Sequence, residues 1–159
     1  MKKKRNTLRG HSSQSTDKGT AFKSKKCIIG IDKKCWGDDR SSLLGKLVNE
    51  RKCVMIEDES AFLMYYSLKI GTKDLHVIGP WEIENGDERI ASNLLDESLS
   101  GMQDTSVVLD VPAENKVARE VLCKAGFEVI GSTVFMYRKN LQDVKFEDIF
   151  GFMSMGSMG

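Results

Sequence analysis

Residues 106–138 constrain the fold more than any other stretch, because the spacing of their apolar side chains changes from a strand-like to a helical period. Residues 107–111 form a short β-branched run, which is typical of a strand covered on both faces. Residues 113–125 repeat apolar side chains at helical spacing, with Asn115 as a candidate cap and Gly126 as a C-terminal stop. The stretch therefore begins as a strand followed by a helix.

Two further strands are predicted after this helix. Residues 127–130 and 133–137 are rich in β-branched and aromatic side chains, and the Gly131-Ser132 pair between them is a hairpin signal. The whole stretch thus has the order strand, helix, strand, strand.

The preceding part of the chain predicts a helix and an antiparallel meander. Asp38 or Asp39 can cap a helix that runs through the leucine-rich residues 43–48. Three apolar or alternating runs after it predict strands. These strands are residues 53–56, 61–70 and 74–78. Residues 27–31 are either a short strand or an apolar loop.

Charge separates the first 26 of the 159 residues from the rest, since they carry nine Lys or Arg and one acid. With little to bury, residues 1–26 are expected to be a disordered basic tail. Lys2 to Arg5 suit a nuclear signal or a phosphate or nucleic-acid contact, and a solubilising tail is the alternative. Residues 27–159 are expected to form a single domain.

No apolar run approaches the length of a membrane span and no apolar signal segment follows the basic start, so we expect an intracellular, cytoplasmic protein without a membrane partner. The basic tail leaves a nuclear location open. Four cysteines occur without metal-ligand spacing or companion histidines, so we expect reduced thiols and no metal site. They are Cys27, Cys35, Cys53 and Cys123.

Asn115, Ala118, Gly126 and Phe127, at these offsets and followed by a hairpin with Met136, resemble the second half of the GNAT N-acetyltransferase superfamily. This resemblance implies an α/β fold. The fold would have a mixed, mainly antiparallel central sheet, two splayed parallel strands and flanking helices.

An earlier segment strengthens the resemblance. Trp36-Gly37 and Asp39-Arg40 ahead of a leucine-rich helix, with a later Ile78-Gly79-Pro80, look like the C-terminal GNAT-type domain of some two-domain acetyltransferases. The likeness covers about residues 28–139, so this chain would be a solitary copy of that domain.

The resemblance implies acetyl-CoA as cofactor, with its pyrophosphate at a turn of small residues before a helix. Gly86 and Ala91 fall in this turn, but Arg89 stands where the family has glycine. Asp87 and Glu88 can cap the helix, yet their charges would repel a pyrophosphate. The turn is therefore degenerate relative to the family pattern.

In the family the pantetheine arm lies between the two splayed strands as if it were an extra strand, bound through backbone groups. Those strands correspond here to residues 74–79 and 107–111. Gly79-Pro80 suits the splay, because proline cannot continue a strand ladder. Ile78, Gly79 and Asn115 complete the predicted cofactor-binding set.

The family commonly protonates the departing thiolate with a tyrosine, and Leu122 stands at that position. A general base for the amine could be His76 or Asp110, which are our predicted catalytic residues. Glu82 and Glu84 are further candidates. Each has a structural alternative: a sheet residue for His76, a turn carboxylate for Asp110, and loop charges for the two glutamates.

Two functions follow for the folded domain. The first is an acyl-CoA-dependent N-acetyltransferase that acts on an unknown amine by direct attack. The second is a non-catalytic GNAT-like module that binds a ligand or a protein partner. Nucleic-acid binding by residues 1–26 is a third reading that needs only the tail.

Overall fold

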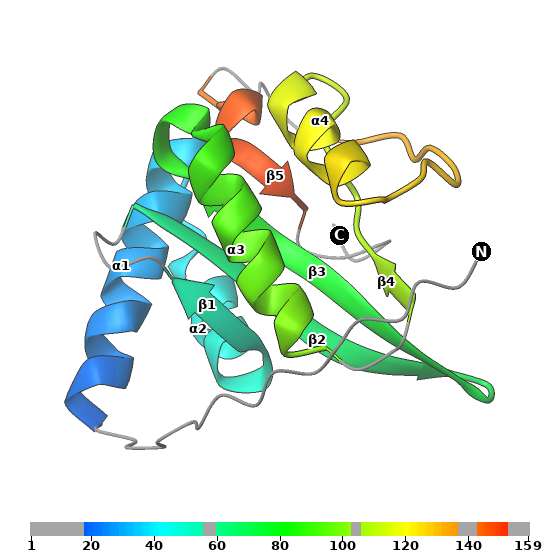
Figure 1. Cartoon of the computed structure of the whole chain (residues 1–159). Helices are drawn as coiled ribbons and strands as arrows, with labels where there is room; N and C mark the ends of the chain where they lie inside the picture. Colours follow the sequence, from blue (N-terminus) through cyan, green and yellow to red (C-terminus); the bar gives the residue numbers. More distant parts are fainter. Residues whose placement is uncertain (1–17, 56–59, 103–105, 137–142, 153–159) are drawn as a thin grey trace.

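The computed structural model describes residues 18–55, 60–102, 106–136 and 143–152, with side chains from Lys25 onward (Figure 1). The helices are α1 (Lys18–Trp36), α2 (Ser41–Glu50), α3 (Glu88–Ser100) and α4 (Lys116–Lys124), with short 3-10 turns η1 (Glu84–Gly86) and η2 (Phe146–Asp148). The strands are β1 (Lys52–Met55), β2 (Ala61–Ile70), β3 (Lys73–Ile83), β4 (Ser106–Val108) and β5 (Ile149–Gly151).

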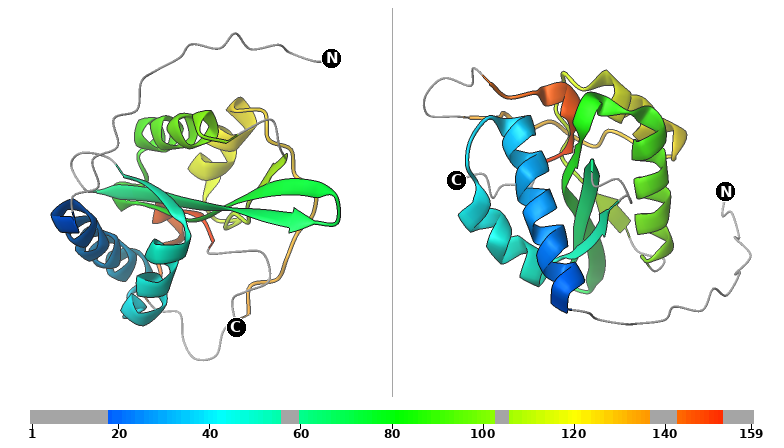
Figure 2. Two further views of the ribbon diagram at one scale, coloured as in Figure 1. Left: turned by 90° about the horizontal axis from the view of Figure 1, so that it is seen from below. Right: turned by 90° about the vertical axis from the view of Figure 1, so that its left-hand side faces the viewer.

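The strands form one mixed sheet between two layers of helices. Its order is β1-β2-β3-β4, with β5 also paired to β3. The β1-β2-β3 meander is antiparallel, whereas β4 runs parallel to β3. Helices α1 and α2 cover one face, and α3 and α4 cover the other (Figure 2). This architecture confirms the predicted GNAT-like α/β fold.

Each face of the sheet has its own core, because successive side chains of a strand point to opposite faces. Trp81, Leu63 and Ile78 pack under α3 and α4, while Phe62 and Met64 pack under α1 and α2. These side chains are fully buried. The two clusters hold the helices against the sheet.

The first helix differs from our prediction. Residues 27–31 lie inside α1, and α1 begins at Lys18, so residues 18–26 are helical where we expected the disordered tail to continue. The reason is a face of buried side chains at helical spacing on Ile28, Ile31 and Cys35. Residues 1–17 lie outside the described part of the chain.

The long strand β3 also corrects a prediction, since it continues through Gly79-Pro80 to Ile83. On β2, Leu63 pairs with Trp81 and Tyr65 pairs with Ile78, so Gly79 and Pro80 together face one β2 residue. This is a β-bulge, which tolerates a proline without a ladder hydrogen bond.

The predicted final hairpin is absent from the described structure, because residues 127–136 contain no strand. Val129, Ile130 and Val134 are instead exposed, with 79–85% of their surface accessible. Residue 137, at the end of the predicted hairpin, lies outside the described residues. The preceding helix is as predicted: Asn115 caps α4 and Gly126 follows it at φ +90°.

Candidate functional site

The parallel strands β3 and β4 stay together for only a short distance. Leu75, His76 and Val77 pair with residues 106–108, and β4 ends there. Beyond this point the neighbour of β3 is β5, which pairs with it at Trp81 and Glu82. The two parallel strands therefore separate next to the end of β3 that leads into α3.

A side chain of the protein itself occupies backbone N–H donors at the turn before α3. The Oδ1 atom of Asp87 accepts hydrogen bonds from the backbone N–H groups of Arg89, at 2.8 Å, and Ile90, at 3.2 Å. Asp87 is thus the N-cap predicted from the sequence. Glu88 is exposed and forms an ion pair with Lys124 of α4, at 2.5 Å. The anion-binding capacity of this helix N-terminus is largely satisfied within the chain.

An open pocket of about 430 Å³ lies beside this turn. Its walls come from η1, from the first turn of α4 and from the segment that leads into β5. The lining residues are Asn85, Gly86, Val117, Lys145, Glu147 and Asp148. Gly86 has φ +59°, and a Cβ atom there would lie 3.0 Å from the carbonyl oxygen of Glu147. Glycine is therefore required for this close approach.

Asn115 connects α4 to the segment beside the pocket. Its Oδ1 atom accepts from the N–H of Ala118 at 2.8 Å, which caps the helix. Its Nδ2 group donates to the carbonyl oxygens of Glu147 and Ile149, both at 2.9 Å. The Asn115 side chain is 2% exposed and its amide is fully used by the chain itself.

The two predicted bases lie near the point where the parallel strands separate. His76 is half-buried in the paired part of β3, and its Nδ1 atom lies 3.1 Å from the hydroxyl oxygen of Ser67. Asp110 follows β4, and partial burial raises the pKa of its carboxyl group. The backbone carbonyl of Asp110 accepts from the N–H of Phe152 at 2.8 Å. A raised pKa makes the Asp110 carboxylate a stronger base.

The remaining predicted positions are buried or bonded within the core. Ile78 of β3 and Ala91 of α3 are fully buried in the core between the sheet and the helices α3 and α4. The carbonyl of Gly79 accepts a hydrogen bond from Arg51. Leu122, at the position where the family has tyrosine, is a core residue with 6% exposure. Of the predicted cofactor set, Gly86 lines the pocket, and both Gly86 and Asn115 contact the backbone of Glu147.

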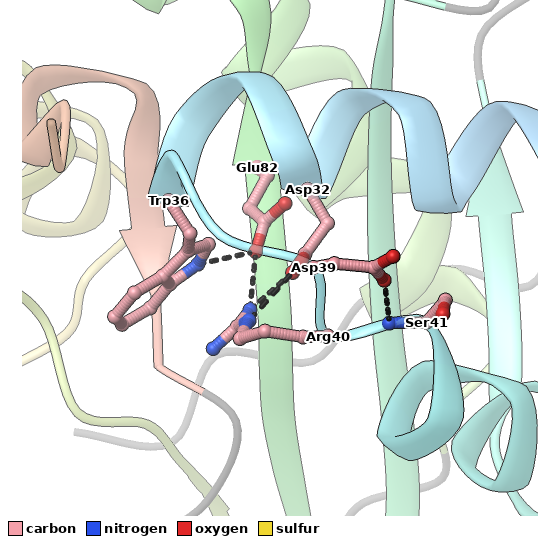
Figure 3. Close-up of polar contacts among 6 residues, drawn as sticks. All are labelled: Asp32, Trp36, Asp39, Arg40, Ser41 and Glu82. Atoms are coloured by element: carbon pink, nitrogen blue, oxygen red, sulfur yellow. Dashed lines mark hydrogen bonds and ion pairs between the residues drawn. The ribbon is translucent and has the colours of Figure 1, made fainter.

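A buried polar cluster on the opposite face of the sheet joins α1, α2 and β3 (Figure 3). Arg40 binds both carboxylates of the cluster: Nε lies 3.1 Å from Asp32 Oδ2, and an Nη2 lies 3.3 Å from Glu82 Oε1. The indole N–H of Trp36 donates to the same Glu82 oxygen at 2.9 Å. The Arg40 guanidinium also stacks over the Trp36 ring, 3.9 Å from its centroid.

The cluster raises the pKa of Glu82. Burial is the main cause, the charge of Asp32 adds to it, and Arg40 and Trp36 oppose it. Glu82 is completely buried, and its Oε2 atom has no hydrogen-bond partner in the described structure. A carboxylate without solvent access cannot take a proton from a diffusing amine, so the cluster fits a structural role better than a general base.

Sequence reasoning identified members of this cluster separately but missed their association. Trp36 and Arg40 belong to the segment that resembles the family, and Glu82 was a candidate base. Asp32 and Trp36 lie one helical turn apart, a signal that becomes visible only when residues 27–36 are assigned to a helix.

In the described part of the chain, no group of three or more His, Cys, Asp or Glu could hold a metal. No described helix is long and apolar enough to span a membrane.

Comparisons with known proteins agree with this fold. The family model described as "Acetyltransferase (GNAT) domain" matches residues 28–151. A solved structure described as a probable acetyltransferase has a TM-score of 0.58 and 12% identity, covering 76% of this chain and 95% of that chain. A point mutant of TTHA1254 from Thermus thermophilus has a TM-score of 0.53 and 16% identity, covering 73% of this chain and 92% of that chain. No curated protein matches significantly.

Proposed function

The chain belongs to the GNAT acetyltransferase domain family, and we propose that it transfers an acetyl group from acetyl-CoA to an amine. The observation that carries this proposal is the pair of parallel strands β3 and β4, which separates beside the turn into α3. Such a separation leaves backbone groups of the two strands unpaired with each other next to a helix N-terminus, and an extended ligand with an anionic end can bind there when these groups are free.

We assign the proton-accepting role to His76. Its ring is half-buried rather than enclosed, it lies one residue before the last β3–β4 pair, and its Nδ1 atom lies 3.1 Å from the Ser67 hydroxyl oxygen. Imidazole is the side chain best suited to exchange protons at physiological pH. Asp110 is the alternative base, because burial raises its pKa.

The conformation of the structure does not fit acetyl-CoA, because groups of the chain itself occupy the binding positions. The backbone donors at the start of α3 are capped by Asp87, and β5 lies beside β3 where the gap opens. Binding therefore requires a rearrangement of the chain's own groups.

The test is an acetyltransfer assay on the full chain with a panel of small amines and lysine-containing peptides. Release of the CoA thiol and mass spectrometry of the acceptor are both measured. We expect amine-dependent thiol release that falls at least about a hundredfold in His76→Ala, the lower end of the range for removal of a general base. Ser67→Ala serves as the neighbouring control that keeps the imidazole. Absence of both thiol release and acetyl-CoA binding would refute the proposal.

A non-catalytic binding module is the second candidate, and two observations favour it. Leu122 is buried where the family has a tyrosine, so no proton donor stands there. Asp87 already satisfies the α3 terminus with a negative charge. The non-catalytic candidate predicts that acetyl-CoA does not bind even when β5 is released from β3. The enzyme candidate predicts that it does bind.

A further inference from the structure

The strand β5 lies in the gap between the two parallel strands and is bonded to both sides. On one side it pairs antiparallel with β3, where Gly151 is opposite Trp81. On the other side the N–H of Phe152 donates to the carbonyl of Asp110 at 2.8 Å. In Figure 1 this strand lies alongside β3, next to α4. It therefore uses backbone groups on both walls of the gap.

Atoms from both walls of the gap lie close to Gly151 of β5. A Cβ atom on Gly151 would lie 3.4 Å from the Cβ of Trp81 and 3.7 Å from the Cδ1 of Leu109. These are ordinary contact distances to the two opposite walls. The neighbouring side chain of Phe150 is fully buried, with its ring 5.2 Å from that of Trp81. Because residues 151–152 are paired with β3 on one side and hydrogen-bonded to Asp110 on the other, this segment occupies the gap at this level.

The other end of the same segment reaches the turn before α3. The carbonyl of Glu147 closes over Gly86. Asp148 is a buried residue, and its carboxyl group accepts a hydrogen bond from the backbone of Asn85. A carboxylate of this chain thus occupies a backbone site beside the helix N-terminus, where an anionic ligand group would bind.

Residues 147–152 therefore follow the path that acetyl-CoA would need. An extended chain with amide groups requires the free backbone edges of β3 and of residues 109–110. Its anionic part requires the turn around Gly86. The segment supplies an extended backbone to the first place and a carboxylate to the second.

We propose that residues 147–152 are an intramolecular competitor of acetyl-CoA, which keeps the cofactor groove closed until the cofactor displaces β5. This inference rests on the proposed function. The closed form holds most molecules, so the apparent affinity for acetyl-CoA is reduced by the fraction of molecules in which β5 is released. Any partner that captures the released segment would raise that affinity.

A pair of variants at Phe152 tests the backbone bond to Asp110. Phe152→Pro removes the N–H donor together with the aromatic ring, whereas Phe152→Ala removes only the ring. The difference in acetyl-CoA affinity between the two variants therefore measures the effect of the hydrogen bond. In calorimetry we expect the proline variant to bind acetyl-CoA about tenfold more tightly than the alanine variant. Circular dichroism and thermal unfolding establish that both variants are folded, and equal affinities in two folded variants would overturn a role for this bond in closing the groove.

A second pair tests the carboxylate. Asp148→Ala removes the buried anion at the turn, and Glu147→Ala removes an exposed charge from the adjacent residue. We expect Asp148→Ala to tighten acetyl-CoA binding by about tenfold and Glu147→Ala to have a much smaller effect. Equal effects would mean that only net charge matters and would contradict a specific competitor.

Hydrogen exchange on the unmodified chain tests the displacement even if a variant does not fold. Saturating acetyl-CoA should deprotect the amides of residues 150–152, while the amides of β2 stay protected. Binding with β5 still protected would overturn the competitor and leave the proposed function intact. Failure of every folded variant, and of the unmodified chain, to bind at millimolar acetyl-CoA would overturn both.

Discussion

Replacing Arg40 with methionine should destabilise the fold strongly, because it leaves two buried carboxylates without their cation. Asp32 is 1% exposed and Glu82 is completely buried. Arg40 forms hydrogen-bonded ion pairs with both. Removal of one partner from a buried ion pair typically costs about 3–5 kcal/mol of unfolding free energy. We expect a loss of that size for Arg40→Met at neutral to mildly alkaline pH.

The loss of unfolding free energy should depend on pH, and the direction of this dependence follows from the raised pKa of Glu82. A carboxyl group whose pKa is raised in the folded state binds its proton more tightly there than in the unfolded chain. The favourable contribution of Glu82 to the free energy of unfolding is therefore fully present below the pKa of the unfolded state, about 4.3. It is lost as pH rises through the pKa of the folded state. Without Arg40 the Glu82 pKa rises further, so Arg40→Met should be less destabilising at about pH 5 than at about pH 8.

Urea unfolding at both pH values, followed by tryptophan fluorescence, measures these differences against the unmodified chain. Adding Glu82→Gln to Arg40→Met should recover part of the stability at the higher pH, because it removes one of the two unpaired charges. Lys124→Met is the matched control: it breaks an exposed ion pair with Glu88 and should leave stability nearly unchanged. An equal loss at both pH values, with no recovery in the double variant, would refute the electrostatic reasoning.

Two further substitutions test how the segment before β5 is held. Asn115→Ser keeps a helix cap but loses the amide donors to Glu147 and Ile149, so thermal unfolding should show a loss of roughly 1–3 kcal/mol, and Asn115→Ala should lose about 1 kcal/mol more. If the serine variant matched the unmodified chain, these two bonds would contribute nothing to stability. Gly86→Ala forces a Cβ onto a positive-φ residue 3.0 Å from the Glu147 carbonyl and should lower stability by about 1–3 kcal/mol in the same assay. Gly131→Ala, which has open space around its new methyl group, is the control, and an equal effect at both glycines would contradict the close approach.

The helix α4 and the meander could be predicted because local chemistry determines them. Asn115 and Gly126 mark the ends of α4, and strand-like runs with tight turns mark β1 and β2. The capping role of Asp87 was also visible in the sequence, and the resemblance to the family implied the separation of β3 from β4. The caps and strand runs depend on residues close together along the chain.

The features that were missed depend on tertiary contacts. The pairing of β5 with β3 joins segments far apart along the chain, and three residues alone carry no clear strand pattern. In α1, the lysines and glycine between Ile28 and Cys35 obscure a helical face that only the sheet reveals. The Asp32–Arg40–Glu82 cluster likewise requires that α1 and β3 be in contact.

The most direct test of β5 as a competitor is an experimental structure of the chain with saturating acetyl-CoA. We predict that the pantetheine arm lies between β3 and residues 109–110, with β5 displaced from Trp81 and the Asp148 carboxylate withdrawn from the turn at Gly86. A complex in which Gly151 remains paired with Trp81, and the cofactor lies elsewhere, would contradict this displacement.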